Sequence, residues 1–295
     1  MRWAEGFIAV DWGTTNRRAY LVDRSGACVG GTEDGQGILS VPKGGFGAAV
    51  AAIRGALGDY PLLLAGMVGS NRGWIETPYV ECPAQLGGLP ARLVRVEQDR
   101  TAIVPGVSYL DGDRADVMRG EEVQILGAVA SGDTPPDCLV CHPGTHNKWI
   151  AMKAGRIDSF RTVMTGEIFN LLRERSILSE LLDAPATSGE PFSEGVRRGL
   201  SSDGLTAELF SAPARTLLGR SRREDGASFV SGLLIGADVR VGVAEDDRGE
   251  VIVMGRPELT ALYAEALRIA GRAPLEIDGE GAFLAGAAKI VELIA

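Results

Sequence analysis

Two glycine turns that carry hydroxyl side chains constrain the fold of this chain more than any other feature. The first, Gly-Thr-Thr-Asn at residues 13–16, follows an apolar run at residues 7–12. The second, Gly-Thr-His at residues 144–146, follows an apolar run at residues 139–141. A short apolar run that ends at such a turn is typical of a buried strand. The sequence therefore predicts one strand–turn–strand unit in each half of the chain.

The residues after each turn repeat one order of elements, in which further strands are followed by a helix. Strands that alternate with helices in this way predict an α/β chain of mixed sheets with flanking helices. The expected elements of the first half are strands at 18–22, 27–30 and 61–65 and a helix at 47–57; those of the second half are strands at 148–152 and 156–164 and a helix at 168–182.

The length of 295 residues corresponds to about two domains. Residues 131–137 contain Gly132, Pro135 and Pro136, which is typical of a linker. The sequence therefore predicts an N-terminal domain at 1–130 and a C-terminal domain at 131–280. A last helix at 281–295 is expected to pack back onto the first domain.

The charge balance excludes some classes of partner. Lys and Arg number 30 against 39 Asp and Glu, a net charge of −9, so wrapping nucleic acid or an anionic membrane is disfavoured. No apolar stretch approaches the ~18 residues of a membrane helix, and the N-terminus has no signal-peptide pattern. Four cysteines do not make a disulfide scaffold. We therefore expect a cytoplasmic protein with a small-molecule substrate, and a homodimer is possible.

The first turn has the chemistry of a phosphate site. Glycine lets the backbone approach a phosphate closely, and exposed N–H groups and hydroxyls can bind its oxygens. The carboxylate of Asp11 cannot face phosphate unaided, which implies a Mg²⁺ ion held through water. The alternative is a plain hairpin in which Asp11 caps the turn.

The second turn lies at the matching place in the other half. The chain has two histidines, His142 and His146, and both lie at this turn, with Lys148 shortly after them. A second phosphate-binding hairpin that faces the first would hold a triphosphate between two domains. The alternative is a polar turn with Trp149 packed behind it.

Cys138, Cys141 and His142 match the C-x-x-C-H pattern of c-type haem attachment, and His146 would complete a set of four zinc ligands. Haem attachment is expected in an exported protein, and no signal peptide is present. The alternation of a strand turns the two cysteines to opposite faces, which argues against zinc. Two buried thiols are the preferred interpretation.

Glu121 and Glu122 share the apolar face of a helix that is expected to open at Met118. Carboxylates on an apolar face need a partner, a metal or a catalytic purpose. The alternative is a solvated first turn, where the helix dipole favours acids. The apolar positions on the same face are Val117, Met118, Ile125, Leu126 and Val129.

Two polar loops at strand ends suit a polyhydroxy acid, because arginine binds carboxylate with two parallel hydrogen bonds. A third corner, where Gly255 precedes a helix from Glu258, could hold the polar edge of a nucleotide. The alternative for each is an ordinary surface connection. The candidate substrate residues are Ser70, Asn71 and Arg72 in one loop and Arg161, Thr165 and Glu167 in the other.

Seven segments together resemble the 2-dehydro-3-deoxygalactonokinases, a family of the actin, sugar kinase and Hsp70 ATPase superfamily. The resemblance implies two RNase H-like, actin-like ATPase domains around a nucleotide cleft. It implies a kinase that uses ATP and Mg²⁺ to phosphorylate the C6 hydroxyl of 2-dehydro-3-deoxy-D-galactonate, in galactonate catabolism. The segments are 9–16, 65–71, 117–122, 143–146, 148–149, 160–167 and 231–237.

Within such a kinase, Asp11 is expected to hold Mg²⁺ and Glu121 to act as the base, with Asp116 and Glu122 as alternatives. The second turn lacks the aspartate that many sugar kinases of this superfamily use as a base. Arg119 and Lys148 are expected to neutralise developing charge. The expected nucleotide contacts are Gly13, Thr14, Thr15, Asn16, Gly144, Thr145, His146 and Gly255.

Two alternatives stay open. The first is a kinase for another sugar acid, such as 2-dehydro-3-deoxygluconate. The second is an actin-like ATPase switch without a small acceptor. ADP release that depends on an acceptor distinguishes a kinase from a switch.

Overall fold

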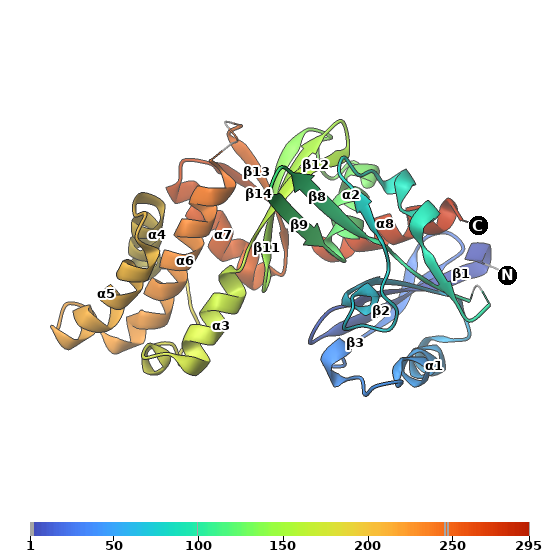
Figure 1. The fold of residues 1–295 in the computed structure, drawn as a ribbon, viewed down its shortest axis with the longest axis horizontal. Coiled ribbons are helices and arrows are strands. Elements are labelled where there is room, and N and C mark those ends of the chain that lie inside the picture. The colour runs from blue at the N-terminus through green and yellow to red at the C-terminus, as the bar shows by residue number, and fades with distance from the viewer. Residues whose placement is uncertain (1–2, 99, 245, 247, 295) are drawn as a thin grey trace. The chain divides into compact units, whose positions relative to one another are not determined.

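The computed structural model describes residues 3–98, 100–244, 246 and 248–294 of the chain (Figure 1). Its contacts divide the chain into two compact units. Unit 1 contains Met1–Asp137, Met152–Ser159 and Gly279–Ala295. Unit 2 contains Cys138–Ala151 and Phe160–Asp278. The contact-defined unit 1 thus extends beyond the range 1–130 expected from the sequence and includes the last helix.

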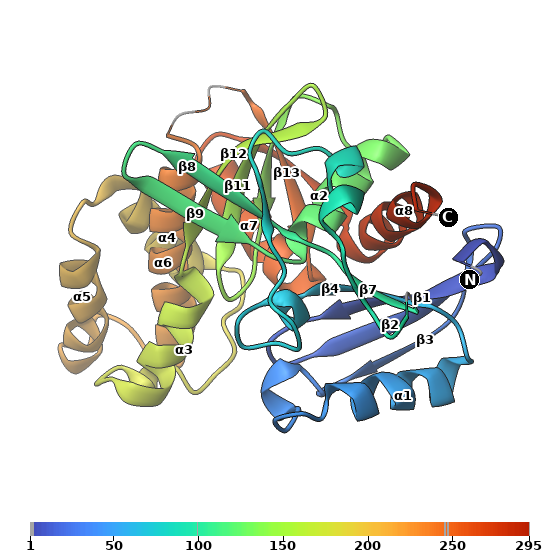
Figure 2. The ribbon, with the colours of Figure 1, turned by 45° about the vertical axis from the view of Figure 1, so that its right-hand side comes forward.

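A six-stranded mixed sheet forms the centre of unit 1. β1 pairs antiparallel with β2, which places Asp11 opposite Arg18, and parallel with β4, which places Asp11 opposite Ala65. Helix α1 (Phe46–Leu57) packs its buried Phe46, Val50 and Ile53 against one face of this sheet (Figure 2). The strand order is β3 (Cys28–Asp34), β2 (Arg17–Asp23), β1 (Gly6–Trp12), β4 (Leu62–Gly66), β7 (Thr101–Ile103) and β6 (Val94–Val96).

A separate three-stranded sheet leads into helix α2 (Glu121–Ser131). The prediction of a helix that opens at Met118 is wrong, because Val117 and Met118 belong to the last strand of this sheet. Gly120 has φ of 103°, a conformation that suits glycine and ends the strand before α2 begins. The strand order is β5 (Tyr79–Glu81), β8 (Gly106–Asp111) and β9 (Arg114–Met118).

Helix α8 (Gly279–Glu292) lies beside α2 in unit 1 (Figures 1 and 2). Two glycines allow the close approach. A Cβ atom on Gly127 would lie 2.1 Å from the carbonyl oxygen of Ala282, and one on Gly286 would lie 2.1 Å from that of Val123. The end of the chain therefore supports the helix that carries Glu121 and Glu122.

A five-stranded sheet, most of whose residues belong to unit 2, repeats the hairpin of unit 1. Its third and fourth strands run parallel, as do its fourth and fifth. The order is β12 (Arg156–Val163), β11 (Asn147–Lys153), β10 (Cys138–His142), β13 (Glu250–Gly255) and β14 (Ala273–Asp278).

Five α-helices are found in the described part of unit 2. The prediction of one helix over 168–182 is wrong at both ends, since α3 begins at Thr165 and ends at Arg175, where the chain turns at Ser176. A short 3-10 helix follows at Ser179–Leu181. The helices are α3 (Thr165–Arg175), α4 (Glu190–Ser201), α5 (Leu205–Leu217), α6 (Gly226–Gly242) and α7 (Pro257–Ile269).

Glycines set the distance between α4 and α6, which lie side by side (Figures 1 and 2). A Cβ atom on Gly195 would lie 2.2 Å from the carbonyl oxygen of Phe229, and one on Gly232 would lie 2.2 Å from that of Phe192. Side chains larger than hydrogen are therefore excluded from this contact. Helix α6 is buried from Gly226 to Val239 as a result, and it carries the segment 231–237 noted in the sequence.

Candidate active site

Asp11 lies at the end of β1, where three chain segments of unit 1 meet. Gly66 ends β4 with φ of 95°. A Cβ atom on Gly120 would lie 3.1 Å from the Cα of Gly66 and 3.9 Å from Oδ1 of Asp11. Only glycine lets the backbone before α2 approach so closely, which brings the N-terminus of that helix to the Asp11 carboxylate.

The backbone of the first glycine turn is held by hydrogen bonds, whereas its threonine side chains are exposed. The N–H of Gly13 donates to the carbonyl of Asn16 at 2.9 Å, which closes the turn. The carbonyls of Gly13, Thr14 and Thr15 accept hydrogen bonds from residues 38, 39 and 37. The threonine side chains are exposed. The turn therefore presents hydroxyls to a ligand, while its carbonyl oxygens are occupied.

Two carboxylates lie at the N-terminus of α2. Oε2 of Glu122 accepts the N–H of Gly120 at 2.7 Å, and Oε2 of Glu121 accepts the N–H of Arg119 at 3.1 Å. Glu122 is only 1% exposed. Burial, followed by the neighbouring charge of Glu121, raises the pKa of Glu122 to about 8. Glu121 and Glu122 thus bond to the backbone that leads into α2, and that backbone packs beside Asp11 at Gly120.

The raised pKa of Glu122 predicts a pH-dependent stability. The folded chain holds this proton more tightly than the unfolded chain does. The resulting contribution to the free energy of unfolding is therefore complete below pH about 4.5 and is lost as pH rises through 8. Glu122→Gln keeps an oxygen for Gly120 but cannot ionise. We expect urea unfolding to show a loss of a few kcal/mol for the wild type between pH 5 and pH 8, and a much smaller loss for the variant. The exposed Glu76→Gln is the control and should behave like the wild type.

Arg119 is directed toward a neighbouring segment of unit 1. Its guanidinium donates to the hydroxyl of Thr77 and, at 2.6 Å, to the carbonyl of Thr77. It also lies 4.1 Å from the ring centroid of Tyr79. Ser70 is buried and donates to the carbonyl of Met67 at 2.7 Å. Of the candidate substrate residues of this loop, Asn71 and Arg72 are exposed.

In unit 2, the second glycine turn packs against the N-terminus of α3. The N–H of Glu167 donates to the carbonyl of Thr145 at 2.9 Å, and the Glu167 carboxylate pairs with His146. A Cβ atom on Gly166 would lie 2.5 Å from the carbonyl oxygen of Gly144. The structure therefore places Thr165 and Glu167, expected to contact substrate, beside the second turn. Arg161 is exposed on β12, and Lys148 is buried on β11.

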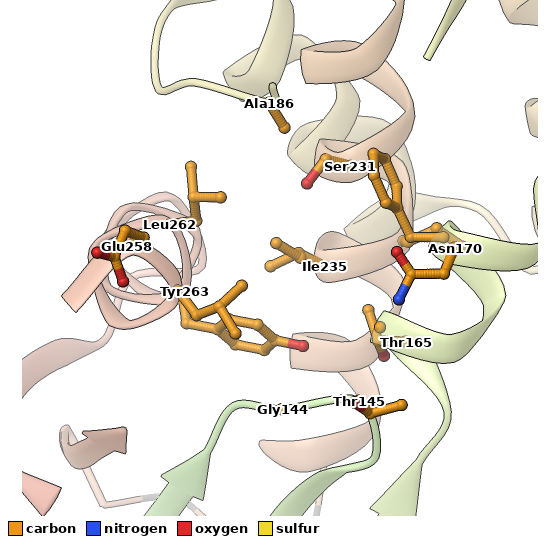
Figure 3. A pocket seen from close by; sticks show the side chains of 14 residues that line it. Gly144, Thr145, Thr165, Asn170, Ala186, Ser231, Ile235, Glu258, Leu262 and Tyr263 are labelled. Carbon is orange, nitrogen blue, oxygen red and sulfur yellow. The ribbon is translucent and has the colours of Figure 1, made fainter. Parts of the chain in front are cut away.

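A cavity of about 310 Å³ opens beside this turn, entirely within unit 2 (Figure 3). One wall is apolar, and Figure 3 shows Ser231 and Asn170 directed into the space. The Ser231 side chain is 7% exposed and has no hydrogen-bond partner among the described residues. Gly255 is not among the lining residues, and a Cβ atom built on it would lie 3.4 Å from the carbonyl oxygen of Pro143, just before the second turn. The lining residues are Gly144, Thr145, Thr165, Gly166, Phe169, Asn170, Ala186, Ser231, Leu234, Ile235, Glu258, Leu259, Leu262 and Tyr263.

Asp238 and Tyr263 are two buried polar residues that the sequence did not single out. Asp238 is 1% exposed in α6, and Tyr263 is 3% exposed in α7. One signal was present, since Asp238 is the one charged residue between Gly226 and Val239. A charged group in such a stretch needs buried partners.

Across the described residues, no three His, Cys, Asp or Glu side chains gather closely enough to hold a metal ion. Cys138 and Cys141 are buried free thiols of β10. No helix of the described chain has the length and apolar character needed to cross a bilayer.

Two solved structures of low sequence identity first define the fold. Component A of (R)-2-hydroxyglutaryl-CoA dehydratase from Acidaminococcus fermentans is 12% identical with a TM-score of 0.55, and 98% of this chain and 99% of that chain are covered. The activator of the 2-hydroxyisocaproyl-CoA dehydratase from Clostridium difficile, solved with ADPNP, is 12% identical with a TM-score of 0.50, over 97% and 94%. The α/β fold is that of the actin-like ATPases and sugar kinases, as predicted.

Comparisons at higher sequence identity assign the chain to one family within this fold. The family model for 2-keto-3-deoxy-galactonokinase matches residues 11–290. The 2-dehydro-3-deoxygalactonokinase of Escherichia coli is 35% identical over 98% of both chains. A candidate 2-dehydro-3-deoxygalactonokinase from Sinorhizobium meliloti has a crystal structure that is 31% identical with a TM-score of 0.91, over 98% and 99%. This chain belongs to the 2-keto-3-deoxy-galactonokinase family, which confirms the resemblance found in its sequence.

Proposed function

We propose that this protein is a kinase that transfers the γ-phosphoryl group of ATP to the C6 hydroxyl of 2-dehydro-3-deoxy-D-galactonate, in galactonate catabolism. The observation that carries the proposal is the family match over residues 11–290. The acidic strand end with its open hydroxyl turn, and the cavity beside the second turn, support it independently. Phosphoryl transfer requires mainly positioning and charge neutralisation, for which these features are suited.

The nucleoside of ATP would occupy the cavity of unit 2. Apolar side chains such as Ile235 and Leu262 can cover a base, and the hydroxyl of Ser231 can bond its edge. Gly144, Thr145 and His146 would then face the phosphates, and Gly255 is proposed as a further nucleotide contact. The close packing of Gly166 on this turn supports a fixed geometry for it.

Mg²⁺ is proposed at Asp11. The donor set fits, because Mg²⁺ is usually bound by one or two carboxylates and keeps several waters. Asp11 is half-buried beside a turn whose exposed Thr14 and Thr15 can reach phosphate oxygens, with Asn16 next to them. Mg²⁺ bound there would neutralise phosphate charge.

The acceptor site is proposed near the start of α2. Glu121 is the first candidate for the base that takes the proton of the C6 hydroxyl, with Glu122 and Asp116 as alternatives. Arg119 and Lys148 are proposed to balance charge. The substrate itself would contact Ser70, Asn71, Arg72 and Arg161, whereas the position of Thr165 and Glu167 beside the second turn favours the nucleotide for those two.

ADP release from Mg-ATP tests the proposal directly. We expect turnover with 2-dehydro-3-deoxygalactonate to exceed turnover with 2-dehydro-3-deoxygluconate, galactose or no acceptor by at least about 100-fold, since about 2.7 kcal/mol of discrimination suffices. Equal ADP release without an acceptor would contradict a kinase and leave an ATPase switch. The same assay on Glu121→Gln addresses the base, because an unchanged kcat would exclude Glu121 from that role.

Ser231→Ala tests the nucleoside end. Loss of one hydrogen bond to the ligand is expected to raise the KM for ATP about three- to tenfold and to leave the KM for the sugar acid unchanged. Ser228→Ala is a matched control, because Ser228 is also 7% exposed on α6 but bonds to Thr187 instead of lining the cavity. If both variants had the same KM for ATP as the wild type, the nucleoside would lie elsewhere.

Location and assembly complete the proposal. A cytoplasmic protein without a nucleic-acid or membrane partner fits the net charge of −9. A homodimer stays a prediction, and light scattering on the purified protein decides it.

A further inference from the structure

A single buried carboxylate organises the wall of the cavity in unit 2. Asp238 of α6 is 1% exposed and accepts hydrogen bonds from four side chains. Nδ2 of Asn147 lies 3.0 Å from both carboxylate oxygens, and Nε1 of Trp149 lies 2.7 Å from Oδ1. The hydroxyls of Thr165 and Tyr263 each lie 2.5 Å from Oδ2. The four donors come from β11, α3 and α7, which all meet at this residue.

Two of these donors also line the cavity. Thr165 and Tyr263 belong to its wall, and Figure 3 shows their hydroxyls directed toward one another beside the second turn. Asn147 and Trp149 are not lining residues. Asp238 itself does not reach the cavity, so any effect it has on a ligand passes through Thr165 and Tyr263.

The chemistry of the cluster fixes the direction of each hydrogen bond. The amide N–H₂ of Asn147 and the indole N–H of Trp149 can only donate, and an ionised carboxylate can only accept. Burial raises the pKa of Asp238 above its usual value, although the hydrogen bonds from its four partners act in the opposite direction. The geometry favours the ionised form, because only two acceptor oxygens without a proton can satisfy all four donors. Burial also raises the pKa of Tyr263, so its hydroxyl keeps the proton that it donates.

A hydroxyl has one proton, and Thr165 and Tyr263 give theirs to Asp238. Any hydrogen bond that either hydroxyl forms with a ligand must therefore be one that it accepts. Phosphate oxygens and sugar-acid carboxylates are themselves acceptors, so this part of the wall disfavours them. A donor, such as a ribose hydroxyl or the amino group of a base, is favoured instead.

We propose that Asp238 is a positioning residue that makes the Thr165 and Tyr263 hydroxyls acceptors, and that the cavity thereby selects a nucleoside which presents a hydrogen-bond donor to them. The inference rests on nucleotide binding in this cavity, as proposed above. It assigns Thr165, which the sequence placed with the substrate, to recognition of the nucleoside. Ser231, whose hydroxyl has no partner in the described chain, can either donate or accept and carries no such restriction.

Asp238→Asn provides the test, because the side chain keeps its shape but replaces one acceptor oxygen by a donor. The new N–H₂ group must point to Thr165 and Tyr263, since Trp149 cannot accept a hydrogen bond. Both hydroxyls would then accept from the new amide group and could donate to a ligand. Calorimetric binding of ATP, inosine triphosphate, 2′-deoxy-ATP and 3′-deoxy-ATP measures the result. Inosine triphosphate lacks the amino group, whereas the deoxy compounds each lack one ribose hydroxyl, so these arms distinguish the two sources of a donor.

For the wild type we expect at least one analogue to bind about tenfold more weakly than ATP, which corresponds to one lost hydrogen bond. Asp238→Asn should reduce that difference to about threefold or less, with the KM for the sugar acid within about twofold of the wild type. Trp149→Phe is the control, since it removes a donor to the same carboxylate outside the cavity. It should lower the melting temperature and keep the discrimination.

If Asp238→Asn does not fold, Thr165→Val and Tyr263→Phe carry the test, because each removes one acceptor and leaves Asp238 in place. At least one of them should lose the discrimination. A wild type that binds ATP and every analogue equally, or an Asp238→Asn variant that discriminates as the wild type does, would overturn this inference alone. A wild type that binds no ATP would overturn the proposed function as well.

Discussion

Asp11→Asn is expected to lower kcat about 10³-fold with little change in stability, because several kcal/mol of transition-state stabilisation depend on the metal. The amide has nearly the shape of the carboxylate but no charge to hold Mg²⁺. Asp11 is half-buried at the end of β1, where the backbone before α2 packs close to its carboxylate. Steady-state kinetics at several Mg²⁺ concentrations measure the loss, and a raised Mg²⁺ requirement should accompany it.

Asp59→Asn is the matched control for this prediction. Asp59 is exposed and lies before β4 begins at Leu62, at the opposite end of that strand from Ala65 and Asp11. Its ion pair with Arg100 is a surface contact of small expected energy. The control should keep the kcat of the wild type. An Asp11→Asn enzyme within threefold of the wild type would exclude Asp11 as the metal ligand.

Gly232→Ala is expected to lower the free energy of unfolding by about 3 kcal/mol and the melting temperature by roughly 10 °C. The added Cβ would lie 2.2 Å from the carbonyl oxygen of Phe192 and 3.0 Å from the N of Val196. These are backbone atoms, so no side chain can turn aside, and α4 and α6 must separate. Chemical and thermal unfolding measure the effect. Because Ser231 and Asp238 are on α6, the KM for ATP should rise too.

Gly55→Ala makes the same change in another helix and should change the free energy of unfolding in the opposite direction. Gly55 is exposed in α1, and a Cβ atom there would meet nothing within 4 Å. Alanine is favoured over glycine in an open helix position by about 0.5–1 kcal/mol, so a small gain in stability is expected. Equal effects of the two substitutions would show that the α4–α6 contact is not as close as described.

Local patterns predicted much of the secondary structure. The apolar runs before each glycine turn are β1 and β10, and the alanine-rich segment at 47–57 is α1. The start of α2 was predicted too early, because Val117 and Met118 fit an apolar helical face as well as a strand. What decides between the two is Gly120, whose positive φ lets the backbone pass beside Gly66, a contact between residues far apart in sequence.

The residues of the candidate site likewise fall into those that the local sequence identifies and those that only the fold identifies. Asp11, Glu121 and the two turns could be found because their chemistry is carried by adjacent residues. Asp238 could not be assigned, since its donors Asn147, Thr165 and Tyr263 are remote in sequence and meet only in the folded unit. The sequence likewise predicts only that Arg119 neutralises developing charge, whereas its contacts with Thr77 and Tyr79 depend on the fold.

The sequence by itself determined the family, the α/β class and the residue types that can bind phosphate and a divalent cation, because these depend on short segments with local chemistry. The tertiary structure decided which side chains share a site and which direction their hydrogen bonds take. The physical reason is that a buried polar group must find its partners wherever the fold brings them. In this chain, Asp238 finds its donors on β11, α3 and α7, and two of them, Thr165 and Tyr263, line the cavity of unit 2.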